Sequence, residues 1–287
     1  MENLDQREGQ LVLVATPLGN LGDITRRALQ LLTEADVIYC EDTRHSRTLF
    51  SANNIPVNGR LRAMHEHNEA AVSSEVVERV QRGETVVVIT DAGTPGISDP
   101  GSRAVAAVAN AGLRVTTAPG PSAVVAALTI SGLATERFIM EGFLPRKAGE
   151  RLAVLQSWKN ESRTVVFYES PQRVLHTLEE MSEVLPGRRV SIIRELTKMH
   201  EEVLRGSVEN LVEALRSRDI LGEIVVVVEG HFEVVVTSDE TIRHALEDQM
   251  NSGVSTRDAV SYVAESLEVP HRAVYQLALE LRAEQGR

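Results

Sequence analysis

The sequence predicts an α/β protein of two domains followed by a small helical extension, and three observations support this. Short apolar runs alternate with stretches of helical periodicity, as in parallel strands joined by crossover helices. The apolar runs are rich in Val, Leu and Ile, which is typical of strands that are covered on both faces. A chain of 287 residues is long for one domain and sufficient for two.

The N-terminal part contains four clear strands, and we expect residues 10–121 to form the first domain. The helix that begins near Thr25 carries Ala28 and Leu32 on one face, as an amphipathic helix does. After the second strand we expect a polar turn at residues 41–45. The expected strands are 11–15, 37–40, 85–90 and 114–118, and the expected helices begin near residues 25, 69 and 102.

A second series of strands and helices begins near Ser122, so we expect residues 122–236 to form the second domain. Its expected strands are 138–140, 164–168, 189–193 and 224–228, and its expected helices are 151–158, 171–184 and 208–216. Residues 238–287 lack strands and predict three short helices. This tail is acidic, so we expect an accessory domain that docks on RNA or on a partner subunit rather than an independent duplex-binding module.

Composition excludes several classes of protein. The net charge of −11 disfavours a broadly basic nucleic-acid surface, although Lys and Arg slightly outnumber Asp and Glu over residues 141–205. No apolar run approaches the ~20 residues that span a bilayer, and residues 1–10 are too polar for a targeting peptide. Cys40 is the only cysteine, and the HEH sequence at 65–67 lacks HExxH spacing, so we expect neither a disulfide nor a metal site. A cytoplasmic location is therefore expected.

Glycine and proline gather in the loops that follow three of the expected strands: TPLGN at 16–20, DAGTPG at 91–96 and APGPS at 118–122. In an open parallel sheet such loops lie at the carboxyl ends of the strands, where ligands bind. The sequence contains neither GxGxxG nor GxxxxGK[ST], which disfavours a nicotinamide dehydrogenase and a P-loop nucleotidase. We therefore expect the three loops to form a ligand site of another class.

Eight motifs follow one another along the chain: ATPLGNLGDIT (15–25), EDTRHS (41–46), TDAGTPGISDPG (90–101), APGPSA (118–123), EGFLPRK (141–147), FYESPQR (167–173), RELTKMHEE (194–202) and GEIVVVVEG (222–230). This series resembles the bacterial small-subunit rRNA cytidine-2′-O-methyltransferases, a branch of the tetrapyrrole methylases. The resemblance extends over about residues 10–230 and continues more weakly through the tail. It implies the class III methyltransferase fold, with a parallel first sheet, a mixed second sheet and a helical extension, and it implies a homodimer.

The same resemblance implies that S-adenosylmethionine binds between the two α/β domains and that the acceptor is a cytidine 2′-hydroxyl in 16S rRNA of the small ribosomal subunit. The residues expected at the cofactor are Pro17, Leu18, Gly19, Asp91, Ala92, Gly93, Ser122, Ala123, Phe143 and Glu223. Basic side chains of the motifs are expected to hold RNA phosphates, for which guanidinium groups are well suited. These are Arg44, Arg146, Lys147 and Arg194.

A ribose 2′-hydroxyl is a poor nucleophile at neutral pH, so we expect a general base. The motifs leave six candidates, which are Glu41, Asp42, His45, Glu169, Glu195 and Lys198. A lysine can accept the proton only if its pKa is lowered, so the candidacy of Lys198 depends on such a shift.

Two other functions stay open. A small-molecule methyltransferase of the tetrapyrrole type predicts a roomy apolar cleft and activity without RNA, but the EDTRHS motif, the basic stretch and the tail weigh against it. A binding module that has lost catalysis predicts degenerate cofactor loops, and the loops here are intact. Affinity for S-adenosylmethionine separates this second alternative from an enzyme.

Overall fold

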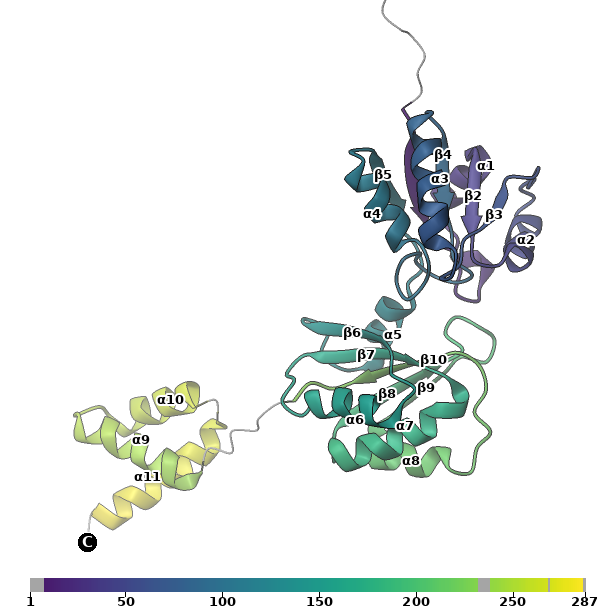
Figure 1. Ribbon diagram of the computed structural model, residues 1–287. Coiled ribbons are helices and arrows are strands. Elements are labelled where there is room, and N and C mark those ends of the chain that lie inside the picture. Colours follow the sequence, from purple (N-terminus) through teal and green to yellow (C-terminus); the bar gives the residue numbers. More distant parts are fainter. Residues whose placement is uncertain (1–7, 232–237, 268, 286–287) are drawn as a thin grey trace, which may run out of the picture. The chain divides into compact units, whose positions relative to one another are not determined.

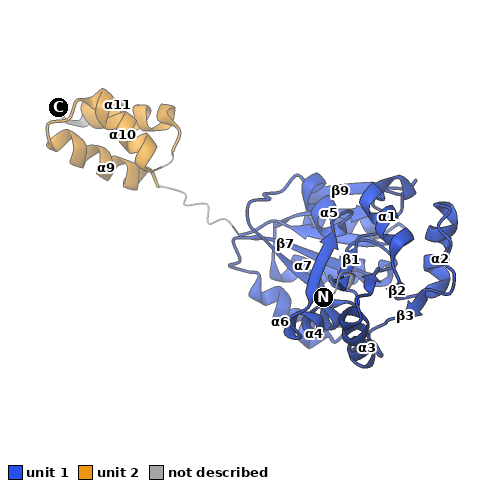
Figure 2. Ribbon diagram, turned by 90° about the horizontal axis from the view of Figure 1, so that it is seen from above, with its two compact units in different colours: residues 1–231 blue, residues 232–287 orange. Residues whose placement is uncertain are grey.

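The computed structural model describes residues 8–231, 238–267 and 269–285. The chain divides into two compact units, residues 1–231 and residues 232–287 (Figure 2). The first unit contains two five-stranded sheets and the second contains three helices (Figure 1). The expectations for residues 1–7 and for the boundary at 232–237 lie outside the described residues.

The first sheet is entirely parallel, with the strand order β3-β2-β4-β1-β5. Its strands are β1 (Gln10–Val14), β2 (Val37–Cys40), β3 (Leu61–Ala63), β4 (Thr85–Val88) and β5 (Arg114–Ala118). Helices α1 (Arg26–Glu34) and α2 (Thr43–Ala52) pack on one face, and α3 (Glu69–Gln81) and α4 (Ser102–Asn110) pack on the other. Because both faces are covered, the central strands β1 and β4 are apolar after their first residues.

The register of β1 explains where the first sheet presents its loops. Val12 and Val14 point into the cluster under α1 and α2, whereas Leu11 and Leu13 point into the cluster under α3 and α4. Leu11 pairs with Val86 of β4 on one side of the strand and with β5 on the other. The carboxyl ends of β4, β1 and β5 therefore meet at one edge of the sheet, as expected from the sequence.

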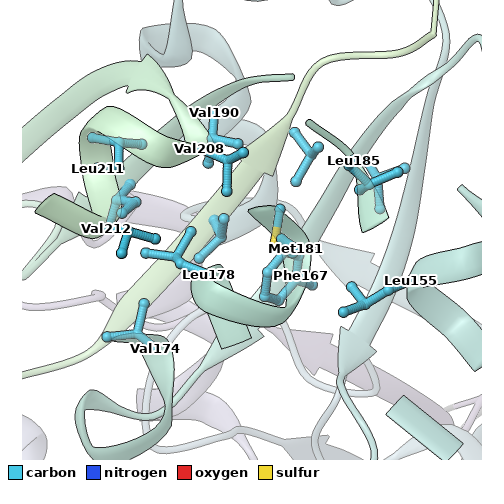
Figure 3. Close-up of a cluster of buried hydrophobic side chains, with 14 of the residues drawn as sticks. Leu155, Phe167, Val174, Leu178, Met181, Leu185, Val190, Val208, Leu211 and Val212 are labelled. Carbon is cyan, nitrogen blue, oxygen red and sulfur yellow. The ribbon is translucent and has the colours of Figure 1, made fainter. Parts of the chain in front are cut away.

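The second sheet is mixed, with the strand order β6-β7-β10-β8-β9 and only β6 and β7 parallel. Its strands are β6 (Phe138–Phe143), β7 (Thr164–Glu169), β8 (Arg189–Arg194), β9 (Glu202–Ser207) and β10 (Ile224–Val228). Helices α6 (Ala148–Ser157), α7 (Pro171–Val184) and α8 (Val208–Leu215) cover one face, where Phe167, Leu178 and Met181 pack together (Figure 3). Helix α5 (Ala123–Ser131) covers the other face. The parallel first sheet and the mixed second sheet are thus confirmed.

Some local expectations were wrong or incomplete. The polar turn expected at 41–45 is the beginning of α2, because Asp42 Oδ1 accepts hydrogen bonds from the backbone N–H of Arg44 (2.7 Å) and His45 (3.4 Å). An aspartate in this position caps a helix by satisfying N–H groups that have no partner within it. The short 3-10 helix at Leu21–Asp23, strands β3 and β9 and helix α5 were not expected from the sequence.

The second unit is a separate three-helix bundle. Its helices are α9 (Asp239–Asn251), α10 (Thr256–Ser266) and α11 (His271–Gln285), and its own core contains Leu246, Val260 and Val263. Ser238 and Ser255 cap α9 and α10 by accepting hydrogen bonds from backbone N–H groups. The three helices expected in the tail are confirmed. None of the helices that the structure describes is both long enough and apolar enough to cross a membrane.

Candidate active site

Hydrogen bonds join the three glycine- and proline-rich loops into one surface. Thr16, after β1, exchanges two backbone hydrogen bonds with Gly93, after β4, at 2.9 and 3.1 Å. The hydroxyl of Thr94 donates to the carbonyl oxygen of Pro121, after β5, at 3.0 Å. Gly93 has a φ of +85°, and a Cβ there would lie 3.1 Å from Leu18 Cδ2. The backbone of each loop is therefore fixed by its neighbours.

A first cavity, cavity A, lies between these loops and the second sheet, with a volume of about 360 Å³. The first sheet contributes Leu18, Asp91 and Asp99 to its wall, and the second contributes Phe143 and Tyr168, whose rings lie 5.4 Å apart between centroids. Phe143 is 61% exposed. The wall thus combines an aromatic surface with carboxylates.

A second cavity, cavity B, has a volume of about 500 Å³ and adjoins cavity A. Its wall is formed by the loop after β1, by His45 and Thr48 of α2, and by Lys198 from the loop between β8 and β9. The two cavities share four lining residues, which are Leu18, Asp91, Ala92 and Glu223. The two cavities therefore adjoin one another at these four residues, which we call their common wall.

The residues expected at the cofactor all lie at these cavities. Leu18, Asp91, Ala92, Ala123, Phe143 and Glu223 line cavity A. Pro17 and Gly19 line cavity B, and Gly93 and Ser122 line a hollow of about 20 Å³ that shares five lining residues with cavity A, among them Leu18, Ala92 and Ala123. The fold therefore brings together residues from motifs that are more than a hundred positions apart in the sequence.

Cavity A is acidic. None of the described residues that line it is Lys, Arg or His. The pKa of Asp99 is raised to about 6, first by burial and then by the charges of Glu41 and Asp91, against the opposing effect of the Thr90 hydroxyl. Burial, followed by the charge of Asp99, raises the pKa of Tyr168 to about 12. Because carboxylates that repel one another are stabilised by a positive charge, the cavity favours a cationic ligand.

Asp91 has an unsatisfied carboxylate oxygen in the same wall. Its Oδ1 atom is buried and has no hydrogen-bond partner among the described residues. A buried acceptor without a donor costs roughly 1–3 kcal/mol, so a ligand that donates a hydrogen bond there would recover this free energy. Asp91 Oδ1 can therefore accept a hydrogen bond from a ligand that bears N–H or O–H groups.

Lys198 forms the centre of a charged cluster at the wall of cavity B. Its Nζ atom lies 2.9 Å from Glu195 Oε1 and 3.0 Å from Glu223 Oε2. Burial lowers the pKa of Lys198, but the hydrogen bonds and charges of the two glutamates outweigh burial, and the net shift is upward. Lys198 therefore lacks the lowered pKa that it would need to act as the general base, and this candidacy is wrong for this arrangement.

The other candidate bases differ in how free their oxygen or nitrogen atoms are. His45 lines cavity B, and Glu195 accepts from Lys198 and from the backbone N–H of Glu223. The Glu41 side chain is exposed but partly desolvated, and this desolvation and then the charge of Asp91 raise its pKa. Asp42 is occupied by the helix cap, which lowers its pKa.

Glu169 also lines cavity A, but its carboxylate is fully buried. It accepts hydrogen bonds from the Thr177 hydroxyl and from the backbone N–H of Ser170, both at 2.8 Å, and it lies 3.3 Å from Arg173 Nε. These three donors leave the carboxylate with a structural role, which argues against Glu169 as the base.

The basic residues expected at RNA lie outside both cavities. Arg44, Arg146 and Lys147 are exposed, and Lys147 pairs with Glu150 at 3.0 Å. Arg194 is held by Glu202 (3.2 Å) and by the carbonyl oxygen of Leu221 (3.0 Å). The structure therefore leaves three of the four guanidinium or ammonium groups open to solvent and fixes the fourth within the protein.

Asp99, Leu196 and Tyr168 were not among the site residues expected from the sequence, although all three line cavity A. Asp99 belongs to the TDAGTPGISDPG motif, so its presence in a cofactor-associated loop was the available signal. Leu196 lines cavity A from the loop after β8, where the preceding Glu195 adopts a φ of +52°. No pattern in the sequence predicts that backbone conformation.

The chain is similar to known proteins over almost its full length. The model of the tetrapyrrole (corrin/porphyrin) methylases matches residues 10–212. A curated relative from Mycobacterium tuberculosis, named ribosomal RNA small subunit methyltransferase I, is 44% identical over 283 residues, covering 97% of each chain. A relative of the same name from Synechocystis is 40% identical over 279 residues, covering 96% of this chain and 99% of the relative.

Solved structures show the same fold at lower identity. Uroporphyrin-III-C-methyltransferase from Thermus thermophilus has a TM-score of 0.52 at 20% identity, over 77% of this chain and 92% of that chain. Diphthine synthase has a TM-score of 0.58 at 15% identity, over 77% and 89%. The resemblance noted in the motifs is thereby confirmed, and the chain belongs to the tetrapyrrole methylases and, within them, to the ribosomal RNA small subunit methyltransferase I family.

Proposed function

We propose that the protein transfers a methyl group from S-adenosylmethionine to the 2′-hydroxyl of a cytidine in 16S rRNA of the small ribosomal subunit. The observation that carries this proposal is the pair of adjoining cavities with a common wall at Leu18, Asp91, Ala92 and Glu223. Group transfer between two bound molecules requires such an arrangement, because donor and acceptor must approach within contact distance. The names of the relatives supply the acceptor class.

Cavity A fits the cofactor. Its volume lies within the range of roughly 300–1,000 Å³ usual for small-molecule sites, and its wall offers acidic groups to a cation. The unsatisfied Oδ1 atom of Asp91 would accept from a hydroxyl or an ammonium group, and Phe143 and Tyr168 offer aromatic faces to a flat ring. When bound, S-adenosylmethionine supplies a methyl group on a positively charged sulfur, which needs no metal.

Cavity B would receive the ribose, and the protein contributes mainly by positioning. Holding two reactants in line can supply roughly 7–11 kcal/mol of the barrier. The proton of the 2′-hydroxyl must leave toward a group at cavity B or at the common wall. His45 and Glu223 meet this condition, whereas Asp42 is bound in the helix cap and Glu169 is buried on three donors.

The exposed Arg44, Arg146 and Lys147 would contact RNA phosphates away from the reacting ribose. Arg44 lies on α2 next to His45, so a strand that inserts one ribose into cavity B would pass this helix. Phosphate contacts fix the position of a nucleic acid and carry no sequence information by themselves. Selection of one cytidine would therefore come from the cavity and from the shape of the subunit.

The proposal is tested by mapping ribose methylation of 16S rRNA from cells with and without the gene. We expect loss of one 2′-O-methyl cytidine, restored by the wild-type protein and not by Asp91→Ala. The exposed Asp219→Ala serves as the matched control and should restore the methyl group. An unchanged map, with S-adenosylmethionine still bound by the purified protein, would overturn the RNA acceptor and favour a small-molecule substrate.

Two further expectations belong to the proposal. An rRNA substrate implies a cytoplasmic location. We also propose a homodimer, for which Val125 of α5 and Phe138 of β6 are exposed apolar side chains on the first unit, at 56% and 42%. Sedimentation velocity of the purified protein tests this, and a monomer at micromolar concentration would contradict it.

A further inference from the structure

Lys198 reaches from the second sheet to the loop that follows β1. The residue lies between β8 and β9, yet its side chain lies directly on the backbone of Gly19. A Cβ atom at Gly19 would collide with Lys198 Cγ and crowd Cδ and Cε as well. Gly19 has no positive φ, so glycine is needed at this position to make room for the Lys198 side chain and not for its backbone conformation.

The ammonium group at the end of this side chain is held in a fixed place. Glu195 Oε1 accepts both from Lys198 Nζ, at 2.9 Å, and from the backbone N–H of Glu223, at 2.9 Å. Gly222, with a φ of +90°, leaves room for the Glu195 carboxylate, with which a Cβ would collide. Glu195 and Thr197 have φ values of +52° and +66°, conformations that are strained for residues other than glycine.

Among the residues that the structure describes, this cluster leaves one donor free. A lysine ammonium has three N–H bonds, and the two glutamates accept two of them. Lys198 lines cavity B and is 28% exposed, so the third N–H is available to a group in that cavity. Glu223, the second acceptor, lines both cavities. The free donor thus lies beside the boundary between the two cavities, where the methyl group would be transferred.

We infer that Lys198 is the acceptor-binding cation of this enzyme, which donates a hydrogen bond in its charged form to the 2′-oxygen of the ribose in cavity B. The inference rests on the proposed function and gives that site a specific residue. As the 2′-oxygen forms its bond to the methyl carbon, the carbon–sulfur bond breaks and its electron pair stays on sulfur. The hydroxyl proton passes to a carboxylate or imidazole at the cavity, and Lys198 keeps all three of its protons.

A positive charge at this point assists the reaction in two ways. It lowers the pKa of the hydroxyl, because an adjacent cation favours the ionised form. It also stabilises the negative charge that develops on oxygen during the transfer, and donors fixed in advance are the most effective at this. The two glutamates hold the ammonium group before the substrate arrives, so little reorganisation is needed.

The test uses Lys198→Ala, Gly19→Ala and the control Gly206→Ala in the full-length protein. A methyl group at Gly206 meets only ordinary contacts, with Asn210 at 3.5 Å and Leu211 at 3.7 Å. Single-turnover methylation of small-subunit RNA with enzyme in excess measures the chemical step, and calorimetry measures S-adenosylmethionine affinity. We expect both site variants to slow the chemical step by roughly 10²–10³-fold, the usual loss for one such donor, and Lys198→Ala to leave cofactor affinity unchanged. Gly206→Ala should match the wild type.

The double variant Gly19→Ala/Lys198→Ala makes the test specific. If Gly19 is required because Lys198 lies on it, the double variant should be no slower than Lys198→Ala alone. If the rate losses of Gly19→Ala and Lys198→Ala multiply in the double variant, the proposed link between Gly19 and Lys198 is overturned. Wild-type rates for Lys198→Ala would overturn the inference while the proposed function stands, whereas a wild-type protein that methylates no RNA would overturn the function itself.

A charge-retaining variant separates a bound cation from a base. Lys198→Arg keeps a donor and a positive charge, so it should be faster than Lys198→Gln at every pH between 6 and 9. A base at position 198 would leave both variants equally slow, because a guanidinium group does not give up its proton in this range. That result would contradict the inference.

Discussion

The Glu169 carboxylate accepts a hydrogen bond from the Thr177 hydroxyl at 2.8 Å, and neither side chain is open to solvent. The bond joins the end of β7 to the middle of α7, which begins two residues after Glu169. Ser170, at the N-cap position of that helix, and Arg173, in its first turn, add further donors to the same carboxylate. Glu169 therefore fixes the start of α7, and α7 supports the wall of cavity A through Ser170 and Pro171.

Glu169→Ala should reduce stability far more than a surface substitution does. Removing one partner of a buried ion pair typically costs about 3–5 kcal/mol, because the remaining groups lose their acceptor. Glu179→Ala is the control, since Glu179 is 43% exposed and lies 3.8 Å from Arg216, and it should cost less than about 1 kcal/mol. Urea denaturation of both variants measures the difference. Equal midpoints would show that the Glu169 cluster contributes little.

The elements that the sequence predicted well are those whose burial leaves a pattern. Strand β10 is buried along its whole length and consists only of Ile and Val, a composition that predicts a buried strand. Strand β9, by contrast, contains Glu202 and Arg205 and lies at the edge of its sheet, where charged residues are usual and the apolar pattern is lost. Helix α2 buries only Ser46 and Phe50, which is too little for a recognisable apolar stripe.

The candidate site was predictable where its chemistry lies in loops and unpredictable where it depends on partners. The motif around Asp91 marks a ligand loop by its glycines and prolines alone. The raised pKa of Lys198 depends in part on Glu223, which lies 25 positions away in the sequence and approaches only because β10 pairs with β8. No reading of the RELTK motif could give the direction of that pKa shift.

Gly93→Ala should weaken cofactor binding more than a comparable change elsewhere. Gly93 has a φ of +85°, and its new methyl group would lie 3.1 Å from Leu18 Cδ2 in the wall of cavity A. Gly112→Ala is the matched control, because its φ is +70° and a Cβ there meets nothing within 4 Å. Both variants carry a left-handed backbone cost of roughly 1–2 kcal/mol, but only Gly93→Ala should raise the Kd for S-adenosylmethionine in calorimetry. Equal affinities in the two variants would contradict the assignment of this loop to the cofactor.

Removing the second unit should leave cofactor binding intact. Every described residue that lines cavity A or cavity B lies between Thr16 and Val225, and the three-helix bundle has a core of its own. A chain that ends at His231 should therefore bind S-adenosylmethionine with the Kd of the full-length protein. The same protein can be assayed for methylation of small-subunit RNA, which shows whether the bundle acts on the acceptor. A weakened Kd would show that the bundle supports the first unit.

Asp99→Asn should stabilise the protein, and the effect should depend on pH. Burial first, and then the charges of Glu41 and Asp91, raise the pKa of Asp99 from 3.8 to about 6. Between these two values the folded protein keeps a proton that the unfolded chain has released, so stability falls as the pH rises through this window. Above pH 6 the cost is complete and amounts to up to about 3 kcal/mol. Asparagine carries no charge, so the variant should be more stable than the wild type at pH 8 and nearly equal to it at pH 4.

The same shift links Asp99 to the cofactor. A cation in cavity A would favour the ionised carboxylate, so binding of S-adenosylmethionine near pH 6 should release a proton and its affinity should increase as the pH rises through 6. Calorimetry in two buffers of different ionisation enthalpy counts the protons released. S-adenosylhomocysteine, which lacks the charge on sulfur, should release fewer, and Asp99→Asn should release fewer with either compound. Identical proton release by both compounds in the wild-type protein would mean that the carboxylates of cavity A do not interact with the sulfonium charge.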